Sequence, residues 1–186
     1  MNSKAVGLTK QEMRSRMLSR LKTQKEEDRN RKSAQIKNKL FRTLAFKKAK
    51  KVMFYIPFGG EVDTRKMISQ AQKLGKTVAV PYAHTHRIIK PCVLHRSAQL
   101  RKGLHGTDEP ATKRFMRLKD IELVVVPGLA FDTRGSRLGR GKGCYDYFLR
   151  RFPRRASSIG LAFDFQILPF VPATATDVSV DKVIFA

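Results

Sequence analysis

Apolar residues near the start of the chain recur at helical spacing. Residues 9–12 carry the Thr-x-x-Glu pattern of a capping box, so a helix is predicted to begin at Lys10. One face of this helix carries apolar residues four positions apart: Met13, Met17 and Leu21. After a polar stretch at residues 25–28, a second amphipathic helix is predicted from another apolar face: Ile36, Leu40, Phe41 and Leu44.

Short apolar runs that stop at a proline predict buried strands. Three runs have this form, at residues 52–56, 77–80 and 121–126. Thr64 is predicted to cap a helix that lies between the first two strands and ends before Gly75. Further strands are expected at residues 87–94, 158–162 and 182–185, and a further helix at residues 144–152.

The alternation of helices and strands predicts an α/β protein. We expect a single domain over residues 1–186, built as a three-layer open sheet that is mainly parallel and has helices on both faces. Ligands of such sheets bind at the carboxyl ends of the strands. The loops expected at those ends follow Ile56, Val80 and Val126, and they carry Glu61 and a glycine-rich segment.

The glycine-rich segment at residues 135–143 is the clearest candidate for chemistry. Its glycines, at positions 135, 139, 141 and 143, alternate with three cations: Arg137, Arg140 and Lys142. Glycines let backbone amides approach an anion closely, and the cations neutralise its charge, so the segment predicts a phosphate-binding loop. It is not a Walker A loop, because Gly143 stands where a serine or threonine should follow the lysine. From the pattern alone, a flexible basic surface loop is the alternative interpretation.

Longer strings extend this picture to a family. Residues 127–149, written PGLAFD…G.RLG.GKG.YD..L, resemble the signature of the 5-formyltetrahydrofolate cyclo-ligases, also called methenyltetrahydrofolate synthetases. Further blocks resemble the same family in the same order: Lys10 and Arg14 as K-x-x-x-R, FYIPFGGEVDT at 54–64, LRKGLHGTDEP at 100–110 and SVDKVIF at 179–185. The resemblance therefore extends over nearly the whole chain.

The resemblance implies an ATP-dependent ligase that converts 5-formyltetrahydrofolate, in its free or its polyglutamylated form, to 5,10-methenyltetrahydrofolate. ATP is then a co-substrate that becomes ADP and phosphate, and Mg²⁺ is the cofactor. The formyl oxygen is phosphorylated, N10 attacks the activated carbon, and phosphate leaves. Phosphoryl transfer asks a protein mainly for positioning and for charge stabilisation, which is what the glycine-rich loop offers.

The family pattern also implies a role for each matching residue. ATP is expected at Lys10, Arg14, Arg137, Leu138, Gly139, Arg140, Gly141, Lys142, Gly143, Cys144 and Tyr145. The folate is expected at Ile56, Glu61, Arg140, Gly141, Lys142, Gly143 and Cys144. Catalysis is expected from Arg140, Lys142 and Tyr145. Mg²⁺, which prefers oxygen ligands, is expected at Asp146 and Asp181.

Glu61 is expected across the cleft from the phosphate-binding loop, where its carboxylate accepts N–H groups of the pterin and takes no part in binding ATP. Without the family, structural roles compete: Lys10 and Arg14 fit solvated helix cations, and Asp146 fits a helix N-terminus. Likewise, Asp181 fits an exposed strand-edge charge and Ile56 a core residue. Three positions depart from common family residues, and they bear on substrate contacts more than on ATP: Cys144, Tyr147 and Thr176.

A formal net charge of +24 is the main compositional anomaly. It motivates the alternative of a basic RNA-binding protein without catalysis; a different ATP-dependent ligase is a third hypothesis. The cations are spread over the chain and no nucleic-acid module is recognisable, so nucleic acid is not required for the leading interpretation. Two cysteines without ligand spacing fit a reducing cytoplasm. The chain shows neither an apolar run of membrane-spanning length nor a secretory signal, and we expect a monomer.

Overall fold

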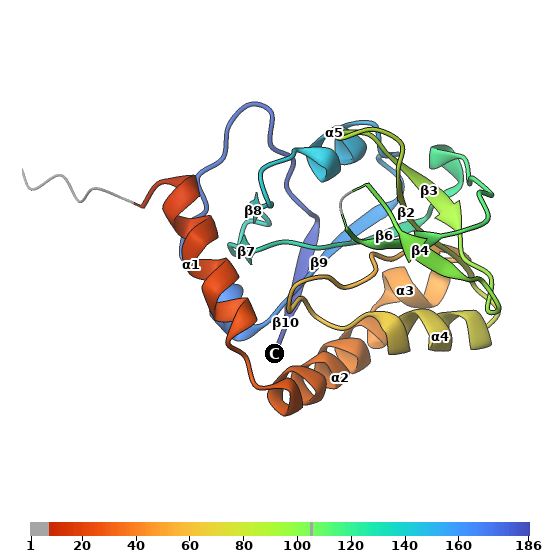
Figure 1. The fold of residues 1–186 in the computed structure, drawn as a ribbon, viewed down its shortest axis with the longest axis horizontal. Coiled ribbons are helices and arrows are strands. Elements are labelled where there is room, and N and C mark those ends of the chain that lie inside the picture. The colour runs from red at the N-terminus through yellow and green to blue at the C-terminus, as the bar shows by residue number, and fades with distance from the viewer. Residues whose placement is uncertain (1–7, 105) are drawn as a thin grey trace, which may run out of the picture.

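The computed structural model describes residues 8–104 and 106–186, and its centre is one six-stranded sheet (Figure 1). The strand order is β10-β9-β6-β1-β2-β3. Neighbouring strands are parallel except for the edge pair β2 and β3, so the expectation of a mainly parallel sheet is confirmed. The strands are β1 (Lys51–Met53), β2 (Thr77–Ala83), β3 (Ile89–Val93), β6 (Leu123–Val126), β9 (Ser157–Ala162) and β10 (Lys182–Phe185).

Helices cover both faces of this sheet. They are α1 (Lys10–Lys22), α2 (Glu26–Arg42), α3 (Leu44–Lys48), α4 (Arg65–Lys73) and α5 (Cys144–Arg150). Side chains alternate along β1, so Val52 and Phe54 pack into the core shared with α1 to α4, whereas Met53 packs with Phe148 and Leu149 of α5. The three-layer prediction is therefore confirmed.

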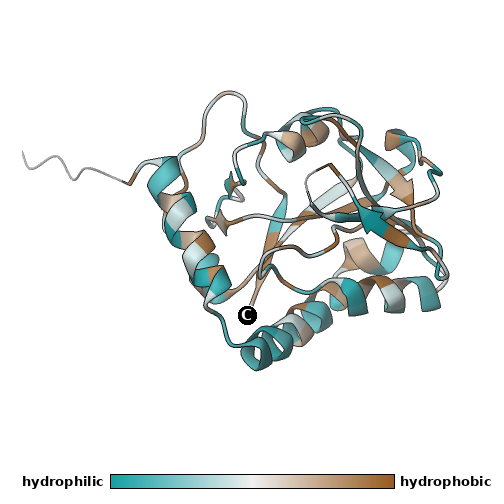
Figure 2. Ribbon diagram, in the orientation of Figure 1, coloured by the Kyte–Doolittle hydropathy of each residue, from teal (hydrophilic) through white to brown (hydrophobic). Residues whose placement is uncertain are grey.

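Smaller elements surround the sheet. Two-stranded ribbons are formed by β4 (Leu100–Lys102) with β5 (Asp108–Pro110), and by β7 (Ala130–Phe131) with β8 (Arg137–Leu138). Figure 2 shows α2 as mostly hydrophilic, in keeping with the few buried residues on it, Ser33, Ile36 and Leu40. None of the helices in the described part of the chain has the length and apolar character needed to cross a membrane.

The predicted capping box at the start of α1 is confirmed, because Thr9 and Glu12 exchange both of its hydrogen bonds. Thr64 occupies the N-cap position of α4, as predicted, but its side chain does not form a capping hydrogen bond. The hydroxyl of Thr64 is buried and donates to the carbonyl of Tyr55 at 2.5 Å, while Asp63 accepts the N–H of Arg65 at 2.9 Å. The Thr64 hydroxyl thus holds the segment after β1 in place, while Asp63 accepts the N–H of Arg65, the first residue of α4.

The prediction that the second strand stops at Pro81 is wrong. β2 continues to Ala83 because β3 runs antiparallel beside it, with Pro81 facing Pro91. The carbonyl of Pro91 accepts a hydrogen bond from Met116 on the side away from β2, so this facing pair needs no N–H from either proline. On the other side of β2, the pairing with β1 ends where Met53 lies beside Ala79. Pro81 lies beyond that point, so its missing N–H costs no hydrogen bond to β1.

Candidate active site

A pocket of about 630 Å³ lies at the carboxyl ends of β1, β2 and β6. The chain runs from β1 to β2 on one side and later returns to place β6 on the other side of β1. This reversal is where open α/β sheets bind ligands. The wall of the pocket includes Pro127 to Leu129 after β6, and Lys10 and Arg14 of α1. The segment after β1 contributes Tyr55, Ile56, Phe58 and Glu61.

The glycine-rich loop forms one side of this pocket. Gly141 and Gly143 have φ angles of +101° and +67°, a conformation that favours glycine. A Cβ placed on either glycine would meet only an arginine side chain, 3.8 Å away, so both line the pocket without close contact in that direction. Gly135 serves a different purpose, because a Cβ there would lie 2.1 Å from the carbonyl oxygen of Val180. It is a packing glycine outside the pocket lining.

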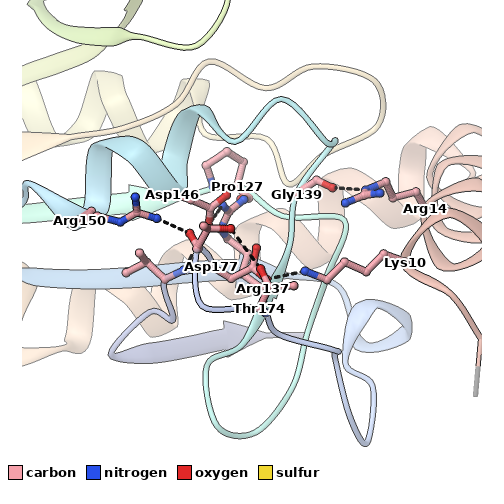
Figure 3. A network of polar contacts seen from close by, with 11 residues as sticks. Lys10, Arg14, Pro127, Arg137, Gly139, Asp146, Arg150, Thr174 and Asp177 are labelled. Carbon is pink, nitrogen blue, oxygen red and sulfur yellow. Dashed lines mark hydrogen bonds and ion pairs between the residues drawn. The ribbon is translucent and has the colours of Figure 1, made fainter.

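Arg137 and Asp146 form a buried ion pair at the base of the loop (Figure 3). The guanidinium Nη2 lies 2.8 Å from Oδ1, and the two side chains are only 4% and 17% exposed. Asp146 also accepts the N–H of Val178 at 3.3 Å. The charge of Arg137 is thus largely neutralised by the protein, which leaves Arg140 and Lys142 as the more accessible cations of the loop.

Two side chains of α1, Lys10 and Arg14, hold this helix against the glycine-rich loop and the segment around Asp177 (Figure 3). Arg14 Nε donates to the carbonyl of Gly139 at 3.0 Å, and Lys10 Nζ donates to Asp177. Asp177 also accepts the N–H and the hydroxyl of Thr174. Burial alone would raise the pKa of Asp177, but these hydrogen bonds outweigh it and hold the pKa below its usual value. The helix thereby carries two cations to the edge of the pocket.

Arg140 links the loop to the segment after β1. Its Nε and Nη2 lie 3.2 and 3.1 Å from Oε1 of Glu61, and Nη2 also donates to the carbonyl of Phe58 at 2.9 Å. Oε2 of Glu61 accepts the N–H of Phe58 at 3.1 Å. Burial raises the pKa of Glu61, although the positive charge of Arg140 opposes the shift. Glu61, which was expected across the cleft from the glycine-rich loop, is thus in direct contact with the Arg140 side chain of that loop.

Tyr145 and Cys144, at the start of α5, both line the pocket and both have raised pKa values. The hydroxyl of Tyr145 is buried and has no hydrogen-bond partner among the described residues, and burial raises its pKa far above the usual value. Burial also raises the pKa of the Cys144 thiol, which donates to the carbonyl of His86 at 3.4 Å. A buried hydroxyl without a partner is costly unless a ligand completes it.

Comparison with known proteins assigns this architecture to a family. The sequence model of the 5-formyltetrahydrofolate cyclo-ligase family matches residues 6–186. The chain belongs to that family. The match spans the helix that carries Lys10 and Arg14, the glycine-rich loop and the last strand, so every side of the pocket lies within the cyclo-ligase match.

Individual relatives agree with the cyclo-ligase assignment. The probable 5-formyltetrahydrofolate cyclo-ligase of Caenorhabditis elegans is 28% identical over 194 residues, covering 97% of this chain and 94% of that protein. The 5-formyltetrahydrofolate cyclo-ligase of Mus musculus is 28% identical over 192 residues, with coverages of 97% and 95%. The solution structure of Aquifex aeolicus 5,10-methenyltetrahydrofolate synthetase matches with a TM-score of 0.85 at 34% identity, covering 96% of this chain and 90% of that one. The protein is thus a ligase of this family.

Fourteen of the fifteen site residues expected from the cyclo-ligase resemblance line the one pocket. The exception is Asp181, whose exposed carboxylate accepts the N–H and hydroxyl of Ser158 at 2.7 and 2.9 Å and so joins the start of β10 to β9. Asp146 lines the pocket and Asp181 does not, so the structure does not bring the two predicted metal ligands together there. Within residues 8–104 and 106–186, no three His, Cys, Asp or Glu side chains form a ready metal cluster.

Among the charged residues that line the pocket, four were not expected from the sequence: Arg87, Asp108, Glu109 and Asp177. Asp177 follows Thr176, one of the positions that depart from the common family residues. The contact of Asp177 with Lys10 was not predicted, because nothing in the local sequence connects the two residues. Glu109 lies within the family block at residues 100–110, but nothing in that string separates a buried acid from a surface one. Arg87 lies in a polar loop between β2 and β3 without a distinctive pattern.

Proposed function

We propose that this cyclo-ligase family protein converts 5-formyltetrahydrofolate to 5,10-methenyltetrahydrofolate while hydrolysing ATP to ADP and phosphate. The family match supports the folate chemistry. One observation carries the extension to ATP: a single pocket is lined both by the cationic glycine loop and by six apolar residues, called here the apolar slot, namely Tyr55, Ile56, Pro81, Ala83, Ile89 and Leu129. Arg140 of the loop bonds to Glu61 in the same pocket. A polyphosphate fits the first part and a flat ring system fits the second.

In the proposed reaction, the formyl oxygen attacks the γ-phosphorus of ATP and ADP leaves. N10 then attacks the activated formyl carbon and loses its proton, and phosphate departs with the former formyl oxygen, leaving the methenyl bridge. Arg140 and Lys142 stabilise the negative charge that spreads over the transferred phosphoryl group. The Tyr145 hydroxyl, which stays protonated, is enclosed and has no partner among the described residues, so it can donate a hydrogen bond to the bound ligand once the surrounding side chains move to expose it.

The pocket offers one carboxylate, that of Asp146, to the Mg²⁺ ion that the family resemblance implies. Mg²⁺ in phosphoryl-transfer sites is held by one or two carboxylates together with substrate phosphates and water. Asp146 supplies one carboxylate at the base of the loop and lies in the pocket lining. When bound, the ion would neutralise phosphate charge, while Arg137 fixes the orientation of the aspartate.

A coupled absorbance assay tests the proposal as a whole. Purified protein is incubated with 5-formyltetrahydrofolate, and the appearance of the methenyl product is followed with and without ATP and Mg²⁺. We expect product only when all components are present, with one ADP per product. ATP consumption that does not depend on the folate, or no product in the complete mixture, would contradict the proposed reaction.

Arg14 provides a narrower test of ATP binding. Replacing Arg14 by alanine is expected to raise the KM for ATP by about 10- to 100-fold, because a hydrogen bond to a charged group is worth about 1.5–3 kcal/mol. Arg16→Ala removes an exposed cation from the same helix and serves as the matched control, with KM within about twofold of the unaltered protein. If both variants had the same KM for ATP, the assignment of α1 to the ATP site would be wrong.

A further inference from the structure

Glu109 is a buried acid without an ionic partner. It lies on β5, is 3% exposed and lines the pocket, yet it forms no ion pair with any residue in the described ranges 8–104 and 106–186. Its Oε1 accepts the backbone N–H of Ala83 at 2.9 Å. A carboxylate held away from water in this way is costly unless other donors complete it.

Only one of the two carboxylate oxygens of Glu109 has a hydrogen bond from the described part of the chain. Oε2 receives no hydrogen bond from the described residues, and it is not completely enclosed by protein atoms. Because the residue is otherwise buried and lines the pocket, this oxygen is available to a ligand in the pocket. A carboxylate offers about four lone-pair directions, so Glu109 can accept two further N–H groups while keeping Ala83.

The surrounding structure holds the Glu109 carboxylate in one place. A Cβ at Gly103 would lie 2.0 Å from the carboxyl carbon and 2.2 and 2.5 Å from its oxygens. The glycine therefore leaves the room that the acid occupies. Gly103 belongs to the turn between β4 and β5, where its N–H donates to Thr107 at 2.8 Å. The ribbon thus positions Glu109 as a fixed acceptor.

Glu109 shares the pocket with the residues of the apolar slot, which are Tyr55, Ile56, Pro81, Ala83, Ile89 and Leu129. Of these, Ala83 contacts Glu109 directly. A flat bicyclic ring fits such a slot, and a pterin ring carries two adjacent donors, its 2-amino group and N3–H, on one edge. Glu61 is less available to them, because Arg140 and Phe58 already donate to both of its oxygens.

We propose that Glu109 accepts the 2-amino and N3–H groups of the pterin ring and so orients the folate in the apolar slot. This inference rests on the proposed function and adds a specificity-determining residue to it. Glu61 then acts mainly through Arg140, at the junction with the phosphate loop. The two buried acids of the pocket thus have separate tasks, one toward the ring and one toward the reacting end.

Equilibrium binding of 5-formyltetrahydrofolate, measured by calorimetry without ATP, tests the assignment. Glu109→Gln keeps the size of the side chain and one acceptor for Ala83, and we expect it to weaken folate binding by about 10- to 100-fold. The KM for ATP should stay within about twofold. The matched control is Glu27→Gln, which alters an exposed acid on α2 and should change neither value.

A modified ligand separates recognition from a structural effect. The 2-desamino-2-methyl analogue lacks one of the two donors, so the unaltered protein should bind it about tenfold more weakly than the natural folate. Glu109→Gln should bind the two ligands with nearly equal affinity. Gly103→Ala, which displaces the carboxylate without removing it, should also weaken folate binding, and adding Glu109→Gln should make it little worse.

The outcomes distinguish the two proposals. If the unaltered protein does not bind 5-formyltetrahydrofolate at all, the proposed function fails. If it binds the folate but Glu109→Gln keeps full affinity, or discriminates against the analogue as before, the role of Glu109 is refuted. A raised ATP KM with unchanged folate binding would place the adenine of ATP, and not the pterin, beside Glu109 and would also overturn the inference.

Discussion

Arg140→Ala is expected to lower kcat by about 100- to 1,000-fold, the usual loss when a donor to developing negative charge is removed. Arg140 is the cation that joins the phosphate loop to the wall of the apolar slot, through Glu61 and Phe58. The substitution should therefore raise the KM values for both ATP and 5-formyltetrahydrofolate. Steady-state kinetics with each substrate varied in turn measures all three constants.

Loss of Arg140 also acts on Glu61. The pair is partly buried, with side chains 33% and 10% exposed, and without the guanidinium the raised pKa of Glu61 should rise further. Glu61→Gln removes that unpaired charge, so the double variant should be less impaired than the sum of the single variants. Arg134→Ala, an exposed cation of the same segment outside the pocket, is the control. Strict additivity of Arg140→Ala and Glu61→Gln would show that the two side chains act independently.

Asp146→Asn is expected to lower kcat by about 100-fold and to raise the Mg²⁺ concentration needed for half-maximal rate. The substitution removes the pocket carboxylate that is proposed to hold the metal. It also leaves Arg137, which is 4% exposed, without its counter-charge, although asparagine keeps one acceptor for it. A loss of about 1–3 kcal/mol in the free energy of unfolding should therefore accompany the kinetic effect. Mg²⁺ titrations and denaturant unfolding separate the two consequences.

Asp181→Asn makes the same chemical change outside the pocket. Its carboxylate joins the start of β10 to Ser158, so we expect a change in stability but an unaltered Mg²⁺ requirement. If Asp181→Asn raised the Mg²⁺ requirement and Asp146→Asn did not, the assignment of the metal to Asp146 would be wrong. Excess Mg²⁺ should restore part of the rate of Asp146→Asn and none of its stability.

Local patterns in the sequence were enough for most of the fold. The Thr9–Glu12 capping box and the strand at residues 182–185 depend on neighbouring residues, and both are found where expected. The partner of the Thr64 hydroxyl and the end of the strand at Pro81 were not predicted, because residues outside the local pattern decide both. A buried carbonyl of Tyr55 captures the Thr64 hydroxyl, and an antiparallel neighbour extends the strand past Pro81.

The site divides in the same way. The glycine loop is contiguous and could be found from its composition, whereas Arg140 and Glu61 are 79 positions apart and no periodicity connects them. The carboxylate of Glu109 is enclosed by the turn at Gly103 and by its hydrogen bond from Ala83. Neither residue forms a sequence pattern that predicts a buried acid. Asp181 was expected in the site through family likeness alone, without a local physical signal.

The contact between Lys10 and Asp177 spans 167 positions. A ribosome delivers the N-terminal end first, so α1 has no Asp177 to bind until almost all of the protein has been synthesised. The phosphate loop that meets Arg14 emerges only after about three quarters of the chain. The proposed ATP site is therefore completed late in synthesis, because both of its contacts to α1 need residues from about the last quarter of the chain.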